Sequence, residues 1–219
     1  MSALYYVLSS IEKVDALFPN LANTLTPQSA AYVSTYKRQE DRRGRQSVRI
    51  LAKLLLSFLS RSGEFRRPAE FSISKYDSGA VYSPQSDLHL SFSHTRTHVA
   101  VAISEKSCGI DIESATREVD REMIAKRFFS KDEYRRVKSD DASFFKIWTA
   151  KEAFLKMEKT GINRPLNTLC VDENNRLISH EKVEFCVFTS SKKIDNQTLI
   201  FSIVEGEDCQ EIAISALKA

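Results

Sequence analysis

With 219 residues, the chain is long enough for one large domain or for two smaller ones. Its 32 Lys and Arg residues against 29 Asp and Glu residues leave a net charge of only +3, which is too small to indicate nucleic-acid binding. Hydrophobic residues make up 42% of the chain and charged residues 28%, so we expect a hydrophobic core and little disorder.

Membrane spans and disulfides are also disfavoured. No stretch approaches the ~20 apolar residues of a membrane span, and the apolar run at residues 4–8 is too short for a signal peptide. The cysteines, Cys108, Cys170, Cys186 and Cys209, are scattered and lack C-x-x-C spacing. We therefore expect a soluble cytoplasmic protein with no membrane and no nucleic-acid partner.

The first predicted elements are a strand and a long helical region. Residues 4–8 are aromatic and β-branched, which favours a strand. Thr26 followed by Pro27 is typical of a helix start, with Thr26 as the N-cap. The helical pattern continues to about Leu59, and we expect a break near residues 40–41.

Basic residues outnumber acidic ones between residues 37 and 53. Arg42, Arg45 and Arg49 are spaced three and four apart, so they would share one helix face. This patch suggests an anionic ligand. A solvated charged face explains the pattern equally well, and both interpretations stay open.

Short strands follow the helical region. We expect strands over residues 71–74, 88–92 and 98–103. The polar residues 93–97 predict a hairpin turn that carries His94. His89, His94 and His98 lie close in sequence, but they lack cysteine or acidic partners at zinc spacing, so a zinc site is disfavoured.

Residues 109–113, with the sequence Gly-Ile-Asp-Ile-Glu, form the stretch around which the later elements are organised. In a strand, successive side chains point to opposite faces, so Asp111 and Glu113 would project together, away from Ile110 and Ile112. Two carboxylates on one face repel each other, and a Mg²⁺ ion, which takes oxygen ligands, would remove this conflict. The alternative is a half-exposed strand with a solvated acidic face.

Helices are predicted after this strand. We expect them over residues 120–128, after Ser130 and from residue 142 to about residue 159. Ser130 and Glu133 have the spacing of a capping box, which gives Glu133 a complete structural explanation. Gly161 is expected to end the last helix.

The last of these helices carries a third acidic group. Trp148, Glu152 and Lys156 are spaced four apart and would line one helix face. A routine salt bridge between Glu152 and Lys156 is one explanation. Because aromatic and aliphatic residues leave little polar surface around Glu152, its carboxylate needs a cation or a hydrogen-bond partner.

The chain closes with strand-like segments. We expect these strands over residues 168–172, 183–189, 198–204 and 211–217. Val99–Ser104 and Glu211–Ser215 resemble each other and close comparable blocks. This similarity suggests a two-fold internal repeat.

The residues quoted above carry a resemblance to a known family. Gly-Ile-Asp-Ile-Glu at 109–113, followed about 35 residues later by Trp-Thr-Ala-Lys-Glu-Ala at 148–153 and by Lys156, resembles the signature of the 4′-phosphopantetheinyl transferases. Residues 92–95, residues 127–130 and the length of the chain are similar to the Sfp-type branch, which consists of two similar halves.

The resemblance implies a fold and a reaction. The fold would be α+β, with two similar halves related by a pseudo-two-fold axis: an N-terminal half over residues 1–105 and a C-terminal half, carrying the Mg²⁺ site, over residues 106–219. The enzyme would transfer the 4′-phosphopantetheine arm of coenzyme A to a serine hydroxyl of an apo acyl or peptidyl carrier protein, giving holo carrier and 3′,5′-ADP, with Mg²⁺ required. We expect a monomer.

The resemblance also implies roles for matching positions. Asp111 and Glu113 would bind Mg²⁺, and Glu152 would be a further metal ligand, the general base for the serine, or both. Lys151 and Lys156 would act in catalysis and bind coenzyme A by placing positive charge on its phosphates.

A second group would hold the 3′-phosphate of coenzyme A. His94 matches the family position that contacts this phosphate, with Ser93 or Thr95 adding hydroxyl donors. Arg45 and Lys53 on the basic helix would complete the clamp. An acidic carrier protein would suit a modestly basic enzyme and would dock on the basic helices of residues 118–138.

Two other functions remain open from the residues alone. A metal-dependent phosphodiesterase or nuclease could use the same three carboxylates, although the broad basic groove that it needs is not apparent. A module that binds coenzyme A or a carrier protein without catalysis is the second alternative. The presence of all three carboxylates and both lysines argues against it.

Overall fold

The computed structural model describes residues 3–60, 66–159, 165–174, 176–179, 183–205 and 208–218. The chain divides into two compact units: unit 1 contains residues 1–107 and 208–219, and unit 2 contains residues 108–207. The division into domains after residue 105 stays a prediction. Each unit combines helices with a sheet, which confirms the predicted α+β class.

The sheet of unit 1 has the strand order β11-β1-β5-β4. These strands are β1 (Leu4–Ser10), β4 (His89–His94), β5 (His98–Ser104) and β11 (Cys209–Glu211). The helices of the unit are α1 (Ile11–Leu17), α2 (Pro27–Ser34) and α3 (Gln39–Leu59). Unit 1 also contains the strands β2 (Ser74–Lys75) and β3 (Val81–Tyr82) and the 3₁₀ helices Leu21–Thr24, Pro68–Glu70 and Ile214–Lys218.

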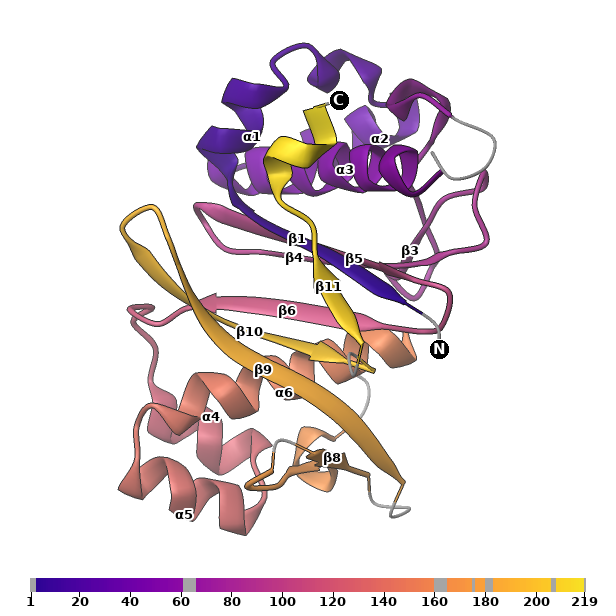
Figure 1. Ribbon diagram of the computed structural model, residues 1–219. Coiled ribbons are helices and arrows are strands. Elements are labelled where there is room, and N and C mark those ends of the chain that lie inside the picture. The colour runs from indigo at the N-terminus through magenta and orange to yellow at the C-terminus, as the bar shows by residue number, and fades with distance from the viewer. Residues whose placement is uncertain are drawn as a thin grey trace. The chain divides into compact units, whose positions relative to one another are not determined.

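The helices α1, α2 and α3 lie on one face of this sheet (Figure 1). Leu51 and Leu55 of α3 are four residues apart, so both point to the same side, where they are fully buried with Val101 of β5. Thr26 caps α2 as predicted, because its hydroxyl accepts a hydrogen bond from the backbone N–H of Ser29 at 3.2 Å.

The helical region breaks earlier than predicted. The structure has its break between Ser34 and Gln39, so the expected break at residues 40–41 is wrong. Glu40 and Asp41 instead lie in the first turn of α3. Negative side chains at this position are stabilised by the partial positive charge of the helix N-terminus, which is why these residues begin a helix here.

The placement of His94 is also corrected. The sequence predicted that His94 lies on the turn, but it is the last residue of β4 and pairs with Val99 of β5. The turn is confined to the next residues, where the backbone N–H of Thr95 bonds the carbonyl of His98 at 2.8 Å. The antiparallel pairing of β4 with β5 therefore continues up to the tight turn that joins them.

The C-terminal segment of unit 1 does not form the predicted strand over residues 211–217. Strand β11 pairs parallel with β1, and the chain then turns into the 3₁₀ helix Ile214–Lys218. With about three residues per turn, this helix places Ile214 and Leu217 on one face, and both are buried in the unit 1 core. The proposed likeness of residues 211–215 to β5 therefore does not extend to their structure.

The sheet of unit 2 has the strand order β6-β10-β9-β8-β7. These strands are β6 (Gly109–Ser114), β7 (Cys170–Val171), β8 (Arg176–Ile178), β9 (Glu184–Ile194) and β10 (Gln197–Val204). The helices are α4 (Arg121–Phe128), α5 (Lys131–Ser139) and α6 (Ser143–Glu158), with a 3₁₀ helix at Leu166–Thr168. The predicted Gly161 stop lies outside the described residues.

Helix α6 packs against β6 and β10 in unit 2 (Figure 1). Gly109, the first residue of β6, allows β6 and α6 to approach each other very closely. A Cβ atom at this position would lie only 1.8 Å from the carbonyl oxygen of Ala153. Among the described residues, no helix is long and apolar enough to cross a membrane.

Candidate active site

Strand β6 presents its carboxylates to α6. Asp111 lies opposite Ser202 of β10, and the Ser202 hydroxyl is 2.7 Å from the Thr149 hydroxyl of α6. Asp111 is only 6% exposed and Glu113 only 9%. The alternative of a solvated acidic strand face is therefore wrong for this strand.

Cations on both sides pair with these carboxylates. Lys156 Nζ of α6 donates to Asp111 Oδ1 at 2.6 Å and to the carbonyl of Ile110 at 3.2 Å. Arg117, just after β6, forms an ion pair with Glu113. Arg117 was not assigned to the site from the sequence, although its spacing of four from Glu113 was an available signal.

The residues Trp148, Glu152 and Lys156 form a partly buried stripe along α6, between faces that are fully buried. Four-residue spacing places them in one row. One end of the row reaches Glu113, since Trp148 makes a side-chain hydrogen bond to it, and the other end reaches Asp111 through Lys156. The row thus follows the carboxylate face of β6, with Glu152 in its middle.

Glu113 and Glu152 hold protons more tightly than isolated carboxyls do. Burial, and then the charge of Asp111, raise the pKa of Glu113 to about 7. The same two causes, in the same order, raise the pKa of Glu152. Lys156 and Arg117 oppose both shifts. The negative charge of Asp111 therefore contributes to the raised pKa of both glutamates.

These carboxylates do not form a ready-made metal site in the described structure. Within the described ranges, no group of three or more His, Cys, Asp and Glu side chains is arranged so that it could hold a metal ion. The donor chemistry nevertheless fits a hard divalent cation, because carboxylate oxygens are the ligands that such an ion prefers and the charge of Asp111 acts on both glutamates. Asp111, Glu113 and Glu152 are the residues that would hold it.

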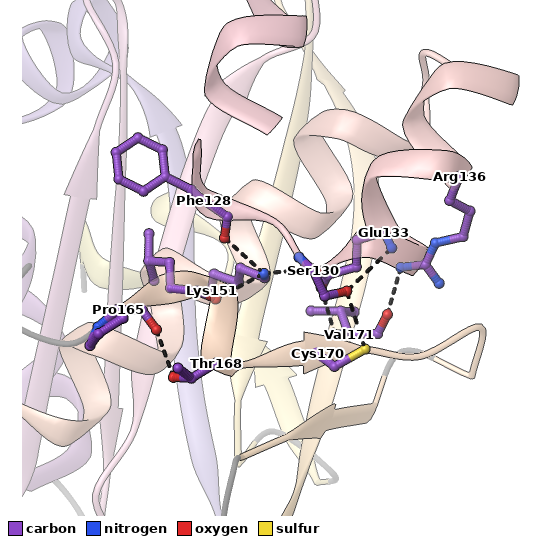
Figure 2. Close-up of polar contacts among 10 residues, drawn as sticks. Phe128, Ser130, Glu133, Arg136, Lys151, Pro165, Thr168, Cys170 and Val171 are labelled. Atoms are coloured by element: carbon purple, nitrogen blue, oxygen red, sulfur yellow. Dashed lines mark hydrogen bonds and ion pairs between the residues drawn. The ribbon is translucent and has the colours of Figure 1, made fainter. Parts of the chain in front are cut away.

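Lys151 is turned away from this face. Figure 2 shows it enclosed between α5 and the chain before β7, and its side chain is 0% exposed. Its Nζ donates to Glu133 Oε2 at 2.6 Å, to the Leu166 carbonyl at 3.0 Å and to the Phe128 carbonyl at 3.2 Å. These acceptors occupy the three donor positions of an ammonium group. The predicted contact of Lys151 with phosphate is therefore contradicted by its burial.

Glu133 does more than cap a helix. The predicted capping box is confirmed, with Glu133 Oε2 accepting from the Ser130 N–H at 2.7 Å. Its other oxygen accepts from the Val171 N–H of β7 at 2.7 Å (Figure 2). Together with Lys151, this carboxylate fastens α5, α6 and β7 to one another. The sequence explained Glu133 by its local cap alone and missed these long-range partners.

In unit 1, the residues expected to bind the 3′-phosphate are only partly exposed. Lys53 is 2% exposed, and its Nζ donates to the Thr24 carbonyl at 2.5 Å. The prediction that Lys53 binds phosphate therefore conflicts with its position, because α3 directs this side chain into the unit. Ser93 is also buried, whereas Thr95 is partly exposed.

His94, which lies beside α3, and Arg45, which belongs to α3, remain partly exposed. His94 packs against Gly44, where an added Cβ would lie 3.0 Å from His94 Nδ1. The Arg45 guanidinium lies 3.7 Å from the ring centre of Tyr36, and its Nη1 is 3.3 Å from the Tyr32 hydroxyl. Neither tyrosine was singled out from the sequence, and their spacing of four was the one signal available.

Residues 107–203 match the family model of the 4′-phosphopantetheinyl transferase superfamily. The chain is 38% identical over 93 residues to the 4′-phosphopantetheinyl transferase gsp of Aneurinibacillus migulanus, covering 40% of this chain and 38% of that protein. It is 39% identical over 90 residues to the 4′-phosphopantetheinyl transferase Sfp of Bacillus subtilis strain 168, covering 39% of each chain.

These two matches span about two-fifths of the length of the curated relatives. A longer match is with the 4′-phosphopantetheinyl transferase ffp of Bacillus subtilis, which is 30% identical over 161 residues, or 69% of this chain and 71% of that protein. The family model includes β6 and α6, which carry the carboxylate face. The chain therefore belongs to the 4′-phosphopantetheinyl transferase superfamily and is similar to its Sfp-type members.

Proposed function

We propose that this protein transfers the 4′-phosphopantetheine arm of coenzyme A to a serine hydroxyl of an apo carrier protein, releasing holo carrier and 3′,5′-ADP. Family membership supports the reaction class. The observation that carries the proposal is the joining of α6 to β6 by Lys156 and Asp111, beside two glutamates with raised pKa values. This arrangement concentrates acid–base groups and positive charge at one partly exposed edge of unit 2.

The chemistry requires a base and positive charge. The serine oxygen forms a bond to the phosphorus that carries the pantetheine arm, the bridging P–O bond of the diphosphate breaks, and 3′,5′-ADP leaves with the bond electrons. Glu152 takes the serine proton, and its raised pKa makes it a stronger base than an ordinary carboxylate. Lys156, whose side chain is 30% exposed, supplies charge to the phosphates.

The metal assignment is part of this proposal. Asp111, Glu113 and Glu152 would hold Mg²⁺, which would neutralise charge on the diphosphate when bound. Repulsion between Asp111 and each of the two glutamates supports this role. The variant Glu152→Gln separates the two roles of Glu152. Loss of a metal ligand would lower the affinity for Mg²⁺, whereas loss of the general base would lower the transfer rate.

Further parts of the proposal concern the surroundings of the site. His94, Arg45 and Thr95 would contact the 3′-phosphate within unit 1. An acidic carrier protein would dock on α4 and α5, where exposed residues such as Lys131 and Lys138 support a basic surface. We also propose a cytoplasmic monomer whose two units are related by a pseudo-two-fold axis.

The proposal is tested by incubating the purified protein with coenzyme A, Mg²⁺ and a panel of apo carrier proteins. Mass spectrometry should show a carrier heavier by one phosphopantetheine arm. The variants Asp111→Asn and Glu152→Gln should lower the rate by roughly a hundredfold or more while retaining the fold, because each removes a charge that acts in the reaction. An unmodified panel with the wild-type protein, or full activity of both variants, would refute the assignment.

A further inference from the structure

A chain of three hydroxyl groups joins α6 to the sheet of unit 2. Thr149 Oγ1 of α6 lies 2.7 Å from Ser202 Oγ of β10, which in turn lies 2.8 Å from Thr189 Oγ1 of β9. Thr149 and Ser202 are both 0% exposed. Replacing a pair of bonded hydroxyls by apolar groups of the same shape can leave stability nearly unchanged, so packing alone does not require hydroxyls here.

The protons of this chain run in one direction. Thr149 Oγ1 donates its single proton to the carbonyl of Phe145 at 2.8 Å, with the carbonyl of Lys146 at 3.3 Å, and carbonyls can only accept. Because that proton is committed, Thr149 can only accept from Ser202, and Ser202 can only accept from Thr189. The hydroxyl protons of Ser202 and Thr189 therefore both point toward α6.

Ser202 also lies next to Asp111. The two residues are register partners on β10 and β6, so their side chains share one face of the sheet, with Cβ atoms about 4.5–5.5 Å apart. A serine hydroxyl can reach a carboxylate over this distance. Among the residues that the structure describes, however, the Ser202 hydroxyl pairs only with Thr149 and Thr189. Asp111 Oδ1 instead accepts from Lys156 Nζ at 2.6 Å.

Thr149 supplies the acceptor that keeps the Ser202 hydroxyl in this direction. Without it, the Ser202 proton would be buried and unsatisfied, which is unfavourable. The carboxylate of Asp111 would be the strongest acceptor within reach, because hydrogen bonds to an ionised group are stronger than those between hydroxyls. A hydroxyl donated to Asp111 would compete with any cation that binds the same oxygens.

We propose that Thr149 is a positioning residue of the active site, which holds the Ser202 hydroxyl toward α6 and so reserves the Asp111 carboxylate for cations. Thr189 supports the same arrangement from β9 by donating to Ser202. This inference deepens the proposed function and rests on it for the assignment of Asp111 to a Mg²⁺ site. The direction of the hydroxyl chain does not depend on that assignment.

The first experiment is structural and needs no substrate. Thr149→Val keeps the shape of the side chain and removes only the acceptor. In a crystal structure of this variant without metal, Ser202 Oγ should lie about 3 Å from a carboxylate oxygen of Asp111. Thr149→Ser, which retains a hydroxyl, should keep the wild-type arrangement. If the Ser202 hydroxyl in Thr149→Val still points toward position 149, the proposal is overturned.

The second experiment measures Mg²⁺ affinity by calorimetric titration of the protein in the presence of coenzyme A. Thr149→Val should weaken Mg²⁺ binding roughly tenfold, and Thr149→Ser should restore it. The double variant Thr149→Val/Ser202→Ala should recover most of the lost affinity, because it removes the misdirected hydroxyl. A merely structural role predicts the reverse, since the double variant lacks two groups. Binding by the double variant that is no tighter than binding by Thr149→Val would therefore refute the positioning role.

Thr168→Val is the matched control for this titration. The Thr168 hydroxyl also donates to a backbone carbonyl of unit 2, that of Pro165, at 2.7 Å. Its removal should leave Mg²⁺ affinity as in the wild type, and a loss equal to that in Thr149→Val would count against the proposal.

Transfer kinetics connect the inference to the reaction. The kcat of Thr149→Val should fall and that of the double variant should recover, while urea titration checks that both variants are folded. A double variant slower than Thr149→Val would contradict the proposed direction of the hydroxyl chain. Absence of transfer by the wild type with every carrier, combined with a Ser202 hydroxyl turned to Asp111 in Thr149→Val, would reject the proposed function and would support the positioning role of Thr149.

Discussion

Lys156 of α6 and Asp111 of β6 are joined by a 2.6 Å ion pair, although they lie 45 residues apart in sequence. We expect Lys156→Met to lower kcat at least about a hundredfold, because it removes positive charge from the phosphates and takes the ammonium group away from the buried carboxylate of Asp111. Steady-state kinetics measure this effect. Lys146→Met is the matched control, since Lys146 is exposed on the same helix. Equal rates in both variants would rule out the role of Lys156.

Gly109 sets the distance between β6 and α6. In Gly109→Ala, the new Cβ would meet the Ala153 carbonyl oxygen 1.8 Å away, so the strand and the helix must separate. We expect a loss of roughly 2 kcal/mol or more in unfolding free energy, together with a fall in transfer rate, as measured by urea titration and kinetics. Gly44→Ala is a milder comparison, because its Cβ would approach only the His94 ring, at 3.0 Å. If Gly109→Ala were as stable as Gly44→Ala, the close packing would not limit the site.

The buried pair of Lys151 and Glu133 should matter for stability. Lys151→Met would leave Glu133 charged and enclosed, which costs about 3–5 kcal/mol of unfolding free energy. The double variant Lys151→Met/Glu133→Gln should recover part of this loss. Chemical denaturation of the single and double variants measures both effects.

An exposed ion pair provides the contrast. Arg135 and Asp132 of α5 form a 2.8 Å pair in which both side chains remain mostly exposed, so Arg135→Ala should not change stability measurably. A loss in Arg135→Ala as large as that in Lys151→Met would show that burial of the pair is not the cause.

The metal-free protein should lose stability as the pH rises through 7. Burial and Asp111 raise the pKa of Glu113 from 4.5 in the unfolded chain to about 7 in the folded one, so the folded state binds the proton more tightly. The resulting stabilisation is complete below pH 4.5 and is lost as the pH rises past 7. At about 1.4 kcal/mol for each pKa unit, it amounts to roughly 3 kcal/mol.

Thermal denaturation in the presence of a chelator measures this effect. Between pH 5 and pH 8, Tm of the wild-type protein should fall more than Tm of Glu113→Gln, which cannot ionise at this position. Identical pH profiles of the two proteins would contradict the raised pKa. Addition of Mg²⁺ at pH 8 should raise Tm of the wild type more than that of the variant.

The carboxylate face was predictable because it depends on local periodicity. Alternation in a strand placed Asp111 and Glu113 together, and four-residue spacing in a helix placed Glu152 and Lys156 together. The direction of Lys151 was not predictable in this way. Its face of α6 is covered by Glu133, whose capping role seemed complete from sequence, although a carboxylate in a cap retains lone pairs for a buried cation.

Long-range packing explains the other differences from the sequence predictions. Lys53 and Arg45 belong to one basic helix, but their environments differ because Thr24 encloses Lys53 while two tyrosines hold Arg45 at a partly exposed position. The contact between Tyr32 and Lys75 joins a helix to a short strand, and neither element has a periodic pattern that identifies its neighbour. Such pairings follow from the tertiary fold rather than from local propensity.

The parallel pairing of β11 with β1 has a consequence for the order of folding. Leu4 pairs with Cys209, so the sheet of unit 1 closes only after about 200 further residues have been synthesised. Unit 2 is continuous over residues 108–207 and can bury its own core earlier. During translation, the edge of β1 that pairs with β11 therefore stays unpaired until residue 209 is made. Unit 2 can fold before that point. A chaperone that shields this edge would act on unit 1 and not on the unit that carries the carboxylates.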